Sequence, residues 1–173
     1  MDYGFYQEAA LATGFTHTAP LDPSTIELKE AVRQMCAACS RYDKCWSCPP
    51  ACGSLEQCRQ RIGKFSQGIL VQTVGQLEDE FDGEGMMETE ATHKENFHRL
   101  LETLNRGDLL PLGAGCCTVC KTCSYPDAPC RFPERMVSSM EAYGMEVAQV
   151  CRANNMPYYH GPNTIAYTSC LLF

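Results

Sequence analysis

Apolar residues recur at helical spacing in two segments of the first third of the chain. The first segment follows Asp22-Pro23-Ser24 and leads into Cys36; its apolar positions are Ile26, Leu28, Val32 and Met35. The second follows Ser54; its apolar positions are Leu55, Cys58, Ile62 and Phe65. Ser24 is followed three residues later by Glu27, and Ser54 by Gln57, which is the sequence form of a capping box. We therefore predict two helices, starting near residues 24 and 54.

The middle of the chain alternates between strand and helix patterns. Residues 68–74 form a short run rich in β-branched side chains and bounded by glycines, which predicts a buried strand. Residues 92–105 predict an amphipathic helix that Gly107 ends; its apolar side carries Phe97, Leu100, Leu101 and Leu104. Residues 109–112 are a second predicted strand, which leads into a glycine-rich turn.

The last third of the chain predicts a helix and two strands. Ser138 or Ser139 is the expected cap of a helical stretch that is interrupted near Gly144 and continues to about residue 154. Residues 157–160 and 164–172 are expected to be strands joined by a turn. Strands thus alternate with helices along the chain. This order favours an α/β fold in which residues 1–173 form a single domain, with a small mixed sheet and flanking helices.

Composition and charge narrow the class of protein. The chain has 173 residues, of which 45% are hydrophobic and 20% charged, as expected of a globular domain. The net charge of −7 disfavours a nucleic-acid partner, which requires a basic face. No apolar run approaches the roughly 20 residues of a membrane span. Acidic residues concentrate in residues 78–90 together with glycines, and we expect a solvated loop there.

The number and placement of the cysteines are unusual for such a globular domain. Six of the 13 cysteines lie in residues 36–58 and five lie in residues 116–130, so we expect metal-binding loops at about 36–58 and 115–134. Crowded thiolates are stabilised by a cation among them, and they select zinc, copper(I) or iron–sulfur clusters. The alternative, a disulfide framework, is typical of secreted proteins. The odd cysteine count and an N-terminus without a basic and apolar leader argue against it, so we expect a reduced, cytoplasmic protein.

The second cysteine segment has the clearer ligand spacing. Its four thiolates follow the pattern Cys117-x2-Cys120-x2-Cys123-x6-Cys130. Two successive C-x2-C steps are typical of the run that holds a [4Fe–4S] cluster in bacterial ferredoxins. Zinc is the alternative, although a zinc site more often combines two C-x2-C pairs from separate parts of the chain. Cys116 is a spare thiol beside a ligand, and we expect it to be a small buried residue.

The first cysteine segment has more thiols than one site needs. A complete ligand set is already provided by Cys36, Cys39, Cys45 and Cys48. Cys52 and Cys58 compete with these four. Cys58 lies one turn into a predicted helix with its Cβ tilted toward the loop, so it is either a ligand or part of the apolar stripe. Tyr42 and Trp46 lie within the segment and either shield a cluster from water or pack in the core.

A wider pattern connects the two segments. Its first half consists of C-x2-C, a tyrosine, W-x-C-P-P, an acidic residue and a further cysteine, here Cys36, Cys39, Tyr42, Trp46, Cys48, Pro49, Pro50, Glu56 and Cys58. Its second half consists of G-x-C-x2-C-x2-C, C-R-x-P-E and S-M-E-x-x-G, here Gly115, Cys117, Cys120, Cys123, Cys130, Arg131, Pro133, Glu134, Ser139, Met140, Glu141 and Gly144. From about Cys36 to its C-terminus, the chain resembles the predicted metal-binding proteins of domain-of-unknown-function family 2284.

The resemblance implies metal or iron–sulfur binding without a settled reaction. It favours Cys117 over Cys116 in the second site. It also favours Cys58 as the fourth ligand of the first site, because Cys45 and Cys52 are additions to the family pattern. Cys45 nevertheless keeps good ligand spacing and stays a candidate. Arg131 and Glu141 are expected to form either a buried pair that braces the second site or a surface pair that contributes little.

These observations predict an iron–sulfur protein that passes electrons to or from a redox partner protein. We expect two [4Fe–4S] clusters, bound by Cys36, Cys39, Cys48, Cys58, Cys117, Cys120, Cys123 and Cys130. Two other classes stay open. One is an enzyme that uses the spare thiols of Cys45, Cys52 and Cys116 or an open iron site. The other is a structural zinc module. No phosphate-binding loop, dinucleotide fingerprint or hydrolase motif is found in the sequence, so no catalytic residue is assigned.

Overall fold

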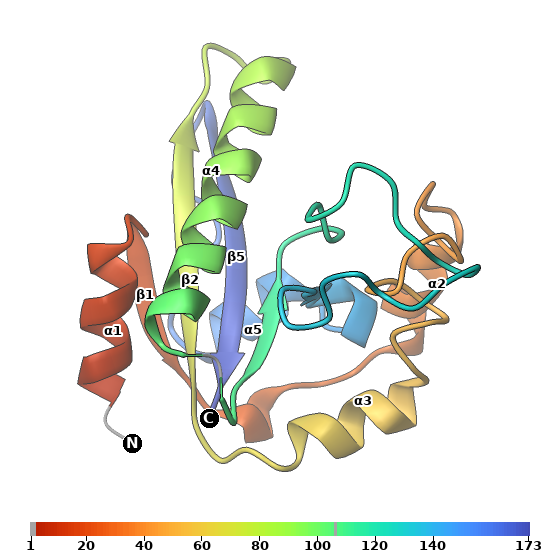
Figure 1. Ribbon diagram of the computed structural model, residues 1–173. Helices are drawn as coiled ribbons and strands as arrows, with labels where there is room; N and C mark the ends of the chain where they lie inside the picture. Colours follow the sequence, from red (N-terminus) through yellow and green to blue (C-terminus); the bar gives the residue numbers. More distant parts are fainter. Residues whose placement is uncertain (1–2, 106) are drawn as a thin grey trace.

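A computed structural model describes residues 3–105 and 107–173 and shows a five-stranded mixed sheet (Figure 1). The strand order is β1-β2-β5-β3-β4. The central strands β2 (Gly68–Gln76) and β5 (Thr164–Leu172) are antiparallel along their whole length. β1 (His17–Leu21) is antiparallel to β2, β3 (Leu110–Gly113) is antiparallel to β5, and β4 (Ser138–Ser139) is parallel to β3. The α/β class and the strands predicted at 68–74, 109–112 and 164–172 are confirmed.

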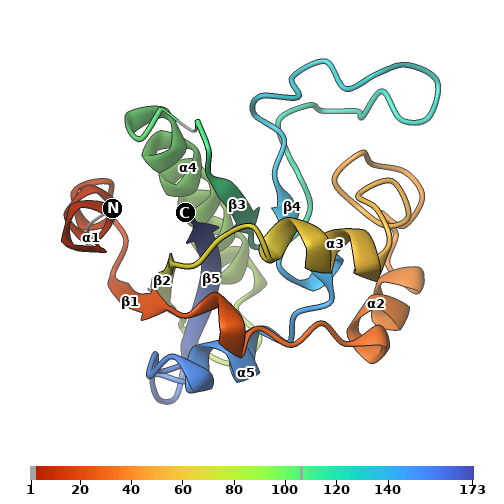
Figure 2. The same ribbon diagram turned by 90° about the horizontal axis from the view of Figure 1, so that it is seen from below.

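Both faces of the sheet are covered, because successive residues of a strand point to opposite faces. Ile69 and Val71 of β2 belong to the core that α1 (Tyr3–Ala12) and α4 (Gly83–Thr103) cover. Leu70 belongs to the opposite core, with side chains of α3 (Leu55–Ile62) and α5 (Val147–Ala153). Figure 2 shows α1 and α4 on one side of the strands and α5 on the other. The central strands therefore carry apolar side chains on both faces.

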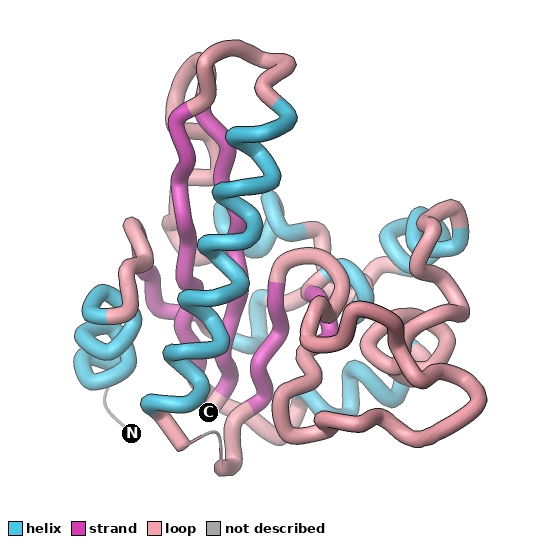
Figure 3. The backbone as a smooth tube through the Cα atoms, turned by 45° about the horizontal axis from the view of Figure 1, so that its top comes forward, coloured by secondary structure: helices cyan, strands magenta, loops and turns pink. Residues whose placement is uncertain are grey.

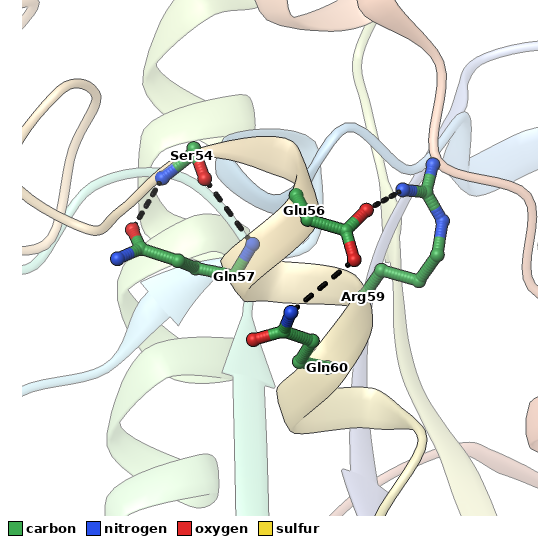
Figure 4. Close-up of polar contacts among 5 residues, drawn as sticks. All are labelled: Ser54, Glu56, Gln57, Arg59 and Gln60. Carbon is green, nitrogen blue, oxygen red and sulfur yellow. Dashed lines mark hydrogen bonds and ion pairs between the residues drawn. The ribbon is translucent and has the colours of Figure 1, made fainter.

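The helix predicted from Ser54 is confirmed as α3. The Ser54 side chain accepts a hydrogen bond from the Gln57 backbone N–H at 3.2 Å, and the Ser54 N–H donates to Gln57 Oε1 at 2.9 Å (Figure 4). Both halves of the capping box are thus formed. Cys58 and Ile62 lie on the buried side of the helix. The capping box and the apolar spacing predict the same helix start, and the helix begins there.

The helix predicted from residue 24 starts later than expected. Asp22 caps only a short 3-10 helix, η1 (Pro23–Thr25), by accepting a hydrogen bond from the Ser24 N–H. The chain then runs extended, because Leu28 forms a bridge with Met145 in the middle of the chain's last third. α2 (Glu30–Ala37) follows with Lys29 as its N-cap. The predicted Ser24–Glu27 capping box is therefore wrong, and a long-range backbone contact is the reason.

The acidic segment is mostly helical. α4 begins at Gly83, so the loop expected over residues 78–90 ends at Asp82 and the helix predicted over 92–105 is longer than expected. Asp82 accepts a hydrogen bond from the Gly85 N–H at 2.9 Å and acts as the N-cap. A carboxylate at this position and Glu84 in the first turn both favour a helix start, because the helix N-terminus is electropositive.

The chain after β4 is a series of short elements. Ser139 Oγ accepts a hydrogen bond from the Ala142 N–H at the start of the 3-10 helix η2 (Glu141–Tyr143), whose N-cap is Met140 rather than the expected serine, and which ends at Gly144 with a φ of 85°. The predicted interruption near Gly144 is confirmed, and α5 continues the helical stretch to Ala153. Residues 157–160 do not form the predicted strand. α1 and β1, near the N-terminus, were not predicted.

The two cysteine-rich segments are loops that lie beside each other at one end of the molecule (Figures 1 and 3). The first loop, residues 38–54, joins α2 to α3, and the second, residues 114–137, joins β3 to β4. β4 is adjacent to β3, so the second loop leaves and re-enters the sheet at neighbouring strands. Within residues 3–105 and 107–173, no helix has the length and apolar character needed to cross a membrane.

Candidate metal centres

Aromatic side chains hold the two cysteine loops together. Trp46 of the first loop donates a hydrogen bond from Nε1 to the carbonyl oxygen of Ala128 in the second loop at 3.0 Å. The Trp46 ring meets the Tyr125 ring edge-on, with 4.8 Å between centroids. The Tyr125 hydroxyl in turn donates to Asp43 Oδ1 at 2.5 Å. The loops therefore form one unit, although about 80 residues separate them along the chain.

Two arginines fix the first loop against the body of the protein. Arg33 of α2 donates from Nη2 to the Gly53 carbonyl and from Nη1 to the Ala142 carbonyl, both at 2.9 Å. Arg61 of α3 donates to the Cys52 carbonyl and to the Tyr143 hydroxyl. Because guanidinium groups present several donors in a rigid plane, each arginine can join two segments at once. The end of the loop is thus tied to the η2 region.

A cavity of about 180 Å³ lies between the loops. Its thiol lining comes from both of them and consists of Cys36, Cys39, Cys48 and Cys116. Glu141 and Arg41 also line it. One carboxylate oxygen of Glu141, Oε2, is buried without a hydrogen-bond partner in the described structure. Three of the ligands predicted for the first site therefore face one cavity, together with a thiol of the second loop.

The remaining thiols of the first cysteine segment, residues 36–58, lie elsewhere. Cys58 is fully buried in the core with α3, and its Sγ is 3.9 Å from Nη1 of Arg33. Cys52 is also buried, with its Sγ 3.7 Å from the Ala142 carbonyl oxygen. Cys45 is buried and faces the second loop, where its thiol lies beside Cys123.

Burial keeps most thiols of the first loop protonated when no metal is bound. It raises the pKa of Cys48 to about 12 and that of Cys52 to about 11. The pKa of Cys123 is instead lowered. Burial alone would raise it, but hydrogen bonds with the backbone of Trp46 and Tyr125 outweigh the effect of burial. A metal binds the thiolate form and must displace the remaining protons.

The donor set fits a thiolate-bound metal in kind and number. All 13 cysteines have free thiols, and 11 of them lie in or beside the two loops. Within the described ranges, no three His, Cys, Asp or Glu side chains are arranged so that they could already hold a metal ion. Metal binding would therefore require thiols to rotate together. Beside the cavity, the buried Oε2 of Glu141 is a further polar atom, and it has no hydrogen-bond partner in the described structure.

Comparison with known protein families identifies the family to which the chain belongs. The sequence pattern of predicted metal-binding proteins, DUF2284, matches residues 19–173, which include both loops and every strand except the first two residues of β1. The chain belongs to the DUF2284 family. Searches of curated proteins and of solved structures found no match. Family membership supports metal binding, and the predicted resemblance is confirmed.

In this DUF2284 protein, the four cysteines predicted for the second site are all half-buried in one loop: Cys117, Cys120, Cys123 and Cys130. Their assignment as ligands stays a prediction, as does that of Cys36, Cys39, Cys45, Cys48 and Cys58 in the first site. Trp46 and Tyr42 do not pack in the core; Trp46 is half-buried between the loops and Tyr42 lines the cavity.

Two features of the site differ from expectation. The predicted Arg131–Glu141 pair is not formed, since Arg131 is exposed and donates to the Thr122 carbonyl within the second loop. Cys116 is half-buried and lines the cavity rather than lying inside the core. The cavity could not be predicted from the sequence, because its walls come from segments distant along the chain.

Proposed function

We propose that this DUF2284 protein is an iron–sulfur protein that binds two [4Fe–4S] clusters through cysteine thiolates and passes single electrons to or from a partner protein. The observation that supports the proposal most directly is the meeting of the two cysteine loops at one end of the sheet. Thiolates are the ligands of such clusters.

The proposed ligands fall into two sets. The second set is Cys117, Cys120, Cys123 and Cys130, whose closely spaced trio suits neighbouring iron corners of a cubane. The first set contains Cys36, Cys39 and Cys48, which face one cavity. Its fourth member is open: the family pattern favours Cys58, and Cys45 and Cys52 are the other candidates from residues 36–58.

The chain's own residues would position and shield the clusters. When bound, a [4Fe–4S] cluster supplies one-electron redox chemistry. Trp46 and Tyr125 cover the contact between the loops, which limits access of water to that region. Hydrogen bonds from the backbone to Cys123 favour its thiolate form. Cys39 is exposed, so a partner protein can approach a cluster through this ligand.

The alternatives receive less support. Free thiols that act as nucleophiles need a lowered pKa, whereas burial raises the pKa of Cys45 and of Cys52. A structural zinc module uses the same thiolates, but three closely spaced cysteines favour a cubane over zinc. Metal content therefore separates the two remaining classes.

The test is anaerobic purification followed by a visible spectrum and by iron, zinc and acid-labile sulfide analysis of one sample. We expect brown protein with about eight irons and eight sulfides per chain, the sum of two four-iron clusters. Colourless protein with about two zinc ions would contradict the proposal and favour a structural zinc module.

A further inference from the structure

We propose that Cys116 is the fourth ligand of the first site, so that the adjacent residues Cys116 and Cys117 serve two different metal centres. The inference rests on the proposed function, since it assigns a ligand within the sites proposed above. It differs from the family pattern, which favours Cys58, and it takes one ligand of the first site from the second loop.

The inter-loop cavity carries the argument. Three of its thiols belong to the first cysteine segment, Cys36 near the end of α2 and Cys39 and Cys48 in the first loop, and Cys116 is the fourth. A cubane or a tetrahedral metal ion requires four ligands around one point. The cavity of about 180 Å³ far exceeds the roughly 10–15 Å³ that a single water molecule needs. Arg41 lines the same space, so a permanent positive charge lies near the thiolates.

Two of the competing thiols, those of Cys58 and Cys52, are held away from this cavity. Cys58 is fully buried among the apolar side chains around α3, and Arg33 lies beside its Sγ. Arg33 is itself fixed by hydrogen bonds to the Gly53 and Ala142 carbonyls. To reach the cavity, Cys58 would have to leave the core and disturb these contacts. Cys52 is buried as well, with its Sγ close to the Ala142 carbonyl.

The backbone before Cys116 explains how this thiol reaches the first loop. Gly115 has a φ of +66°, a conformation that side chains rarely adopt. A Cβ at this position would lie 3.0 Å from Oε1 of Glu90 and 3.3 Å from Nζ of Lys94, the two partners of an ion pair on α4. Glycine thus lets the chain turn closely against α4 directly after β3. The turn brings Cys116 to the cavity.

The next residue is held in a different place. The Cys117 N–H donates to Ser47 Oγ at 3.3 Å, which fixes the backbone between the two thiols against the first loop. Cys117 does not line the inter-loop cavity; it lines a separate, smaller cavity beside α4, which Cys116 also borders. One peptide unit would then connect ligands of two centres, so that electrons could pass between the centres along a short covalent path.

The experiment compares Cys116→Ser, Cys117→Ser, the double variant and Cys58→Ser with the wild-type chain, all purified anaerobically. Iron and sulfide are measured per chain, and far-UV circular dichroism verifies the fold. We expect about four irons to be lost in Cys116→Ser, about four in Cys117→Ser and all eight in the double variant. Cys58→Ser should keep eight. If Cys116 is a spare thiol, its variant keeps eight irons and the double variant matches Cys117→Ser, which overturns the inference.

A second measurement needs no variant. Alkylation of the native protein, with mass spectrometry to locate the label, should leave Cys116 unlabelled together with Cys36, Cys39 and Cys48. All four should become labelled after metal removal. Labelling of Cys116 in the metal-loaded protein while those three stay protected would overturn the inference even if the serine variants fail to fold.

The metal found in the wild-type chain separates this inference from the proposed function. If the wild type holds zinc and no iron, the iron–sulfur proposal fails. The assignment of Cys116 is then judged by zinc: loss of about one of two ions in Cys116→Ser supports it, and unchanged zinc overturns it. A wild type that holds neither metal and takes up no Co²⁺ after reduction overturns both proposals.

Discussion

At the scale of single residues, His93 is a polar group whose surroundings fix its charge. It is fully buried on α4, and its ring nitrogens lie 2.9 Å from Thr73 Oγ1 of β2 and 2.7 Å from Ser169 Oγ of β5. Burial lowers the pKa of His93 to about 3, and nearby Lys94 acts in the same direction. The neutral ring therefore joins the helix to both central strands.

This burial predicts a loss of stability in acid. Between pH 6.5 and about 3 the unfolded chain binds a proton at His93 and the folded chain does not, so stability falls as the pH is lowered from 7. From pH 7 to pH 5, we expect the wild type to lose about 2 kcal/mol more than His93→Gln, whose amide does not titrate. Urea unfolding of both proteins at both pH values measures the difference. Equal losses would show that His93 is not held neutral.

At the scale of elements, α3 connects the first cysteine loop to the core. Its start is fixed by the Ser54–Gln57 capping box, and its exposed side carries Glu56, which contacts Arg59 and Gln60 (Figure 4). The cap satisfies backbone groups that otherwise have no partner. Both side chains of the Glu56–Arg59 pair are more than half exposed, so the pair is expected to contribute little to the free energy of unfolding.

The two kinds of contact can be separated by mutation. Ser54→Ala should lower the free energy of unfolding by about 1 kcal/mol, because the Gln57 N–H loses its acceptor. Glu56→Ala, on the same turn, is the matched control and should change it by less than about 0.5 kcal/mol. Urea denaturation of the three proteins measures both values. Equal effects of the two substitutions would contradict the role given to the cap.

The elements also show which features were predictable from sequence. The α3 capping box lies within four residues and was predicted correctly, whereas the same motif at Ser24 failed because Leu28 bridges to Met145. That bridge joins residues far apart along the chain and leaves no local pattern. Similarly, cysteine spacing identified two ligand-rich loops, but not the cavity between them. The cavity depends on β3 and β4 being neighbours, and β4 is only two residues long.

At the scale of the whole molecule, the apolar cores and the cysteine loops are separate. The two clusters of buried apolar residues are built from the sheet and its helices, and they include Cys58 of α3, the ligand that the family pattern favours. The loops are instead held by a few hydrogen bonds and by the contact of Trp46 with Tyr125. Folding of the sheet should therefore not depend on metal.

Metal removal should loosen the loops without unfolding the sheet. After anaerobic treatment with chelator and reductant, we expect nearly unchanged far-UV circular dichroism but faster tryptic cleavage in the loops. The sites are the exposed residues Arg41, Lys44, Lys121 and Arg131. Cleavage after Arg99, which lies within α4 four residues before its end, is the internal control and should stay slow. Loss of the helical spectrum on metal removal would instead place this protein with small metal domains that fold only around their metal, because binding and folding would then be one transition.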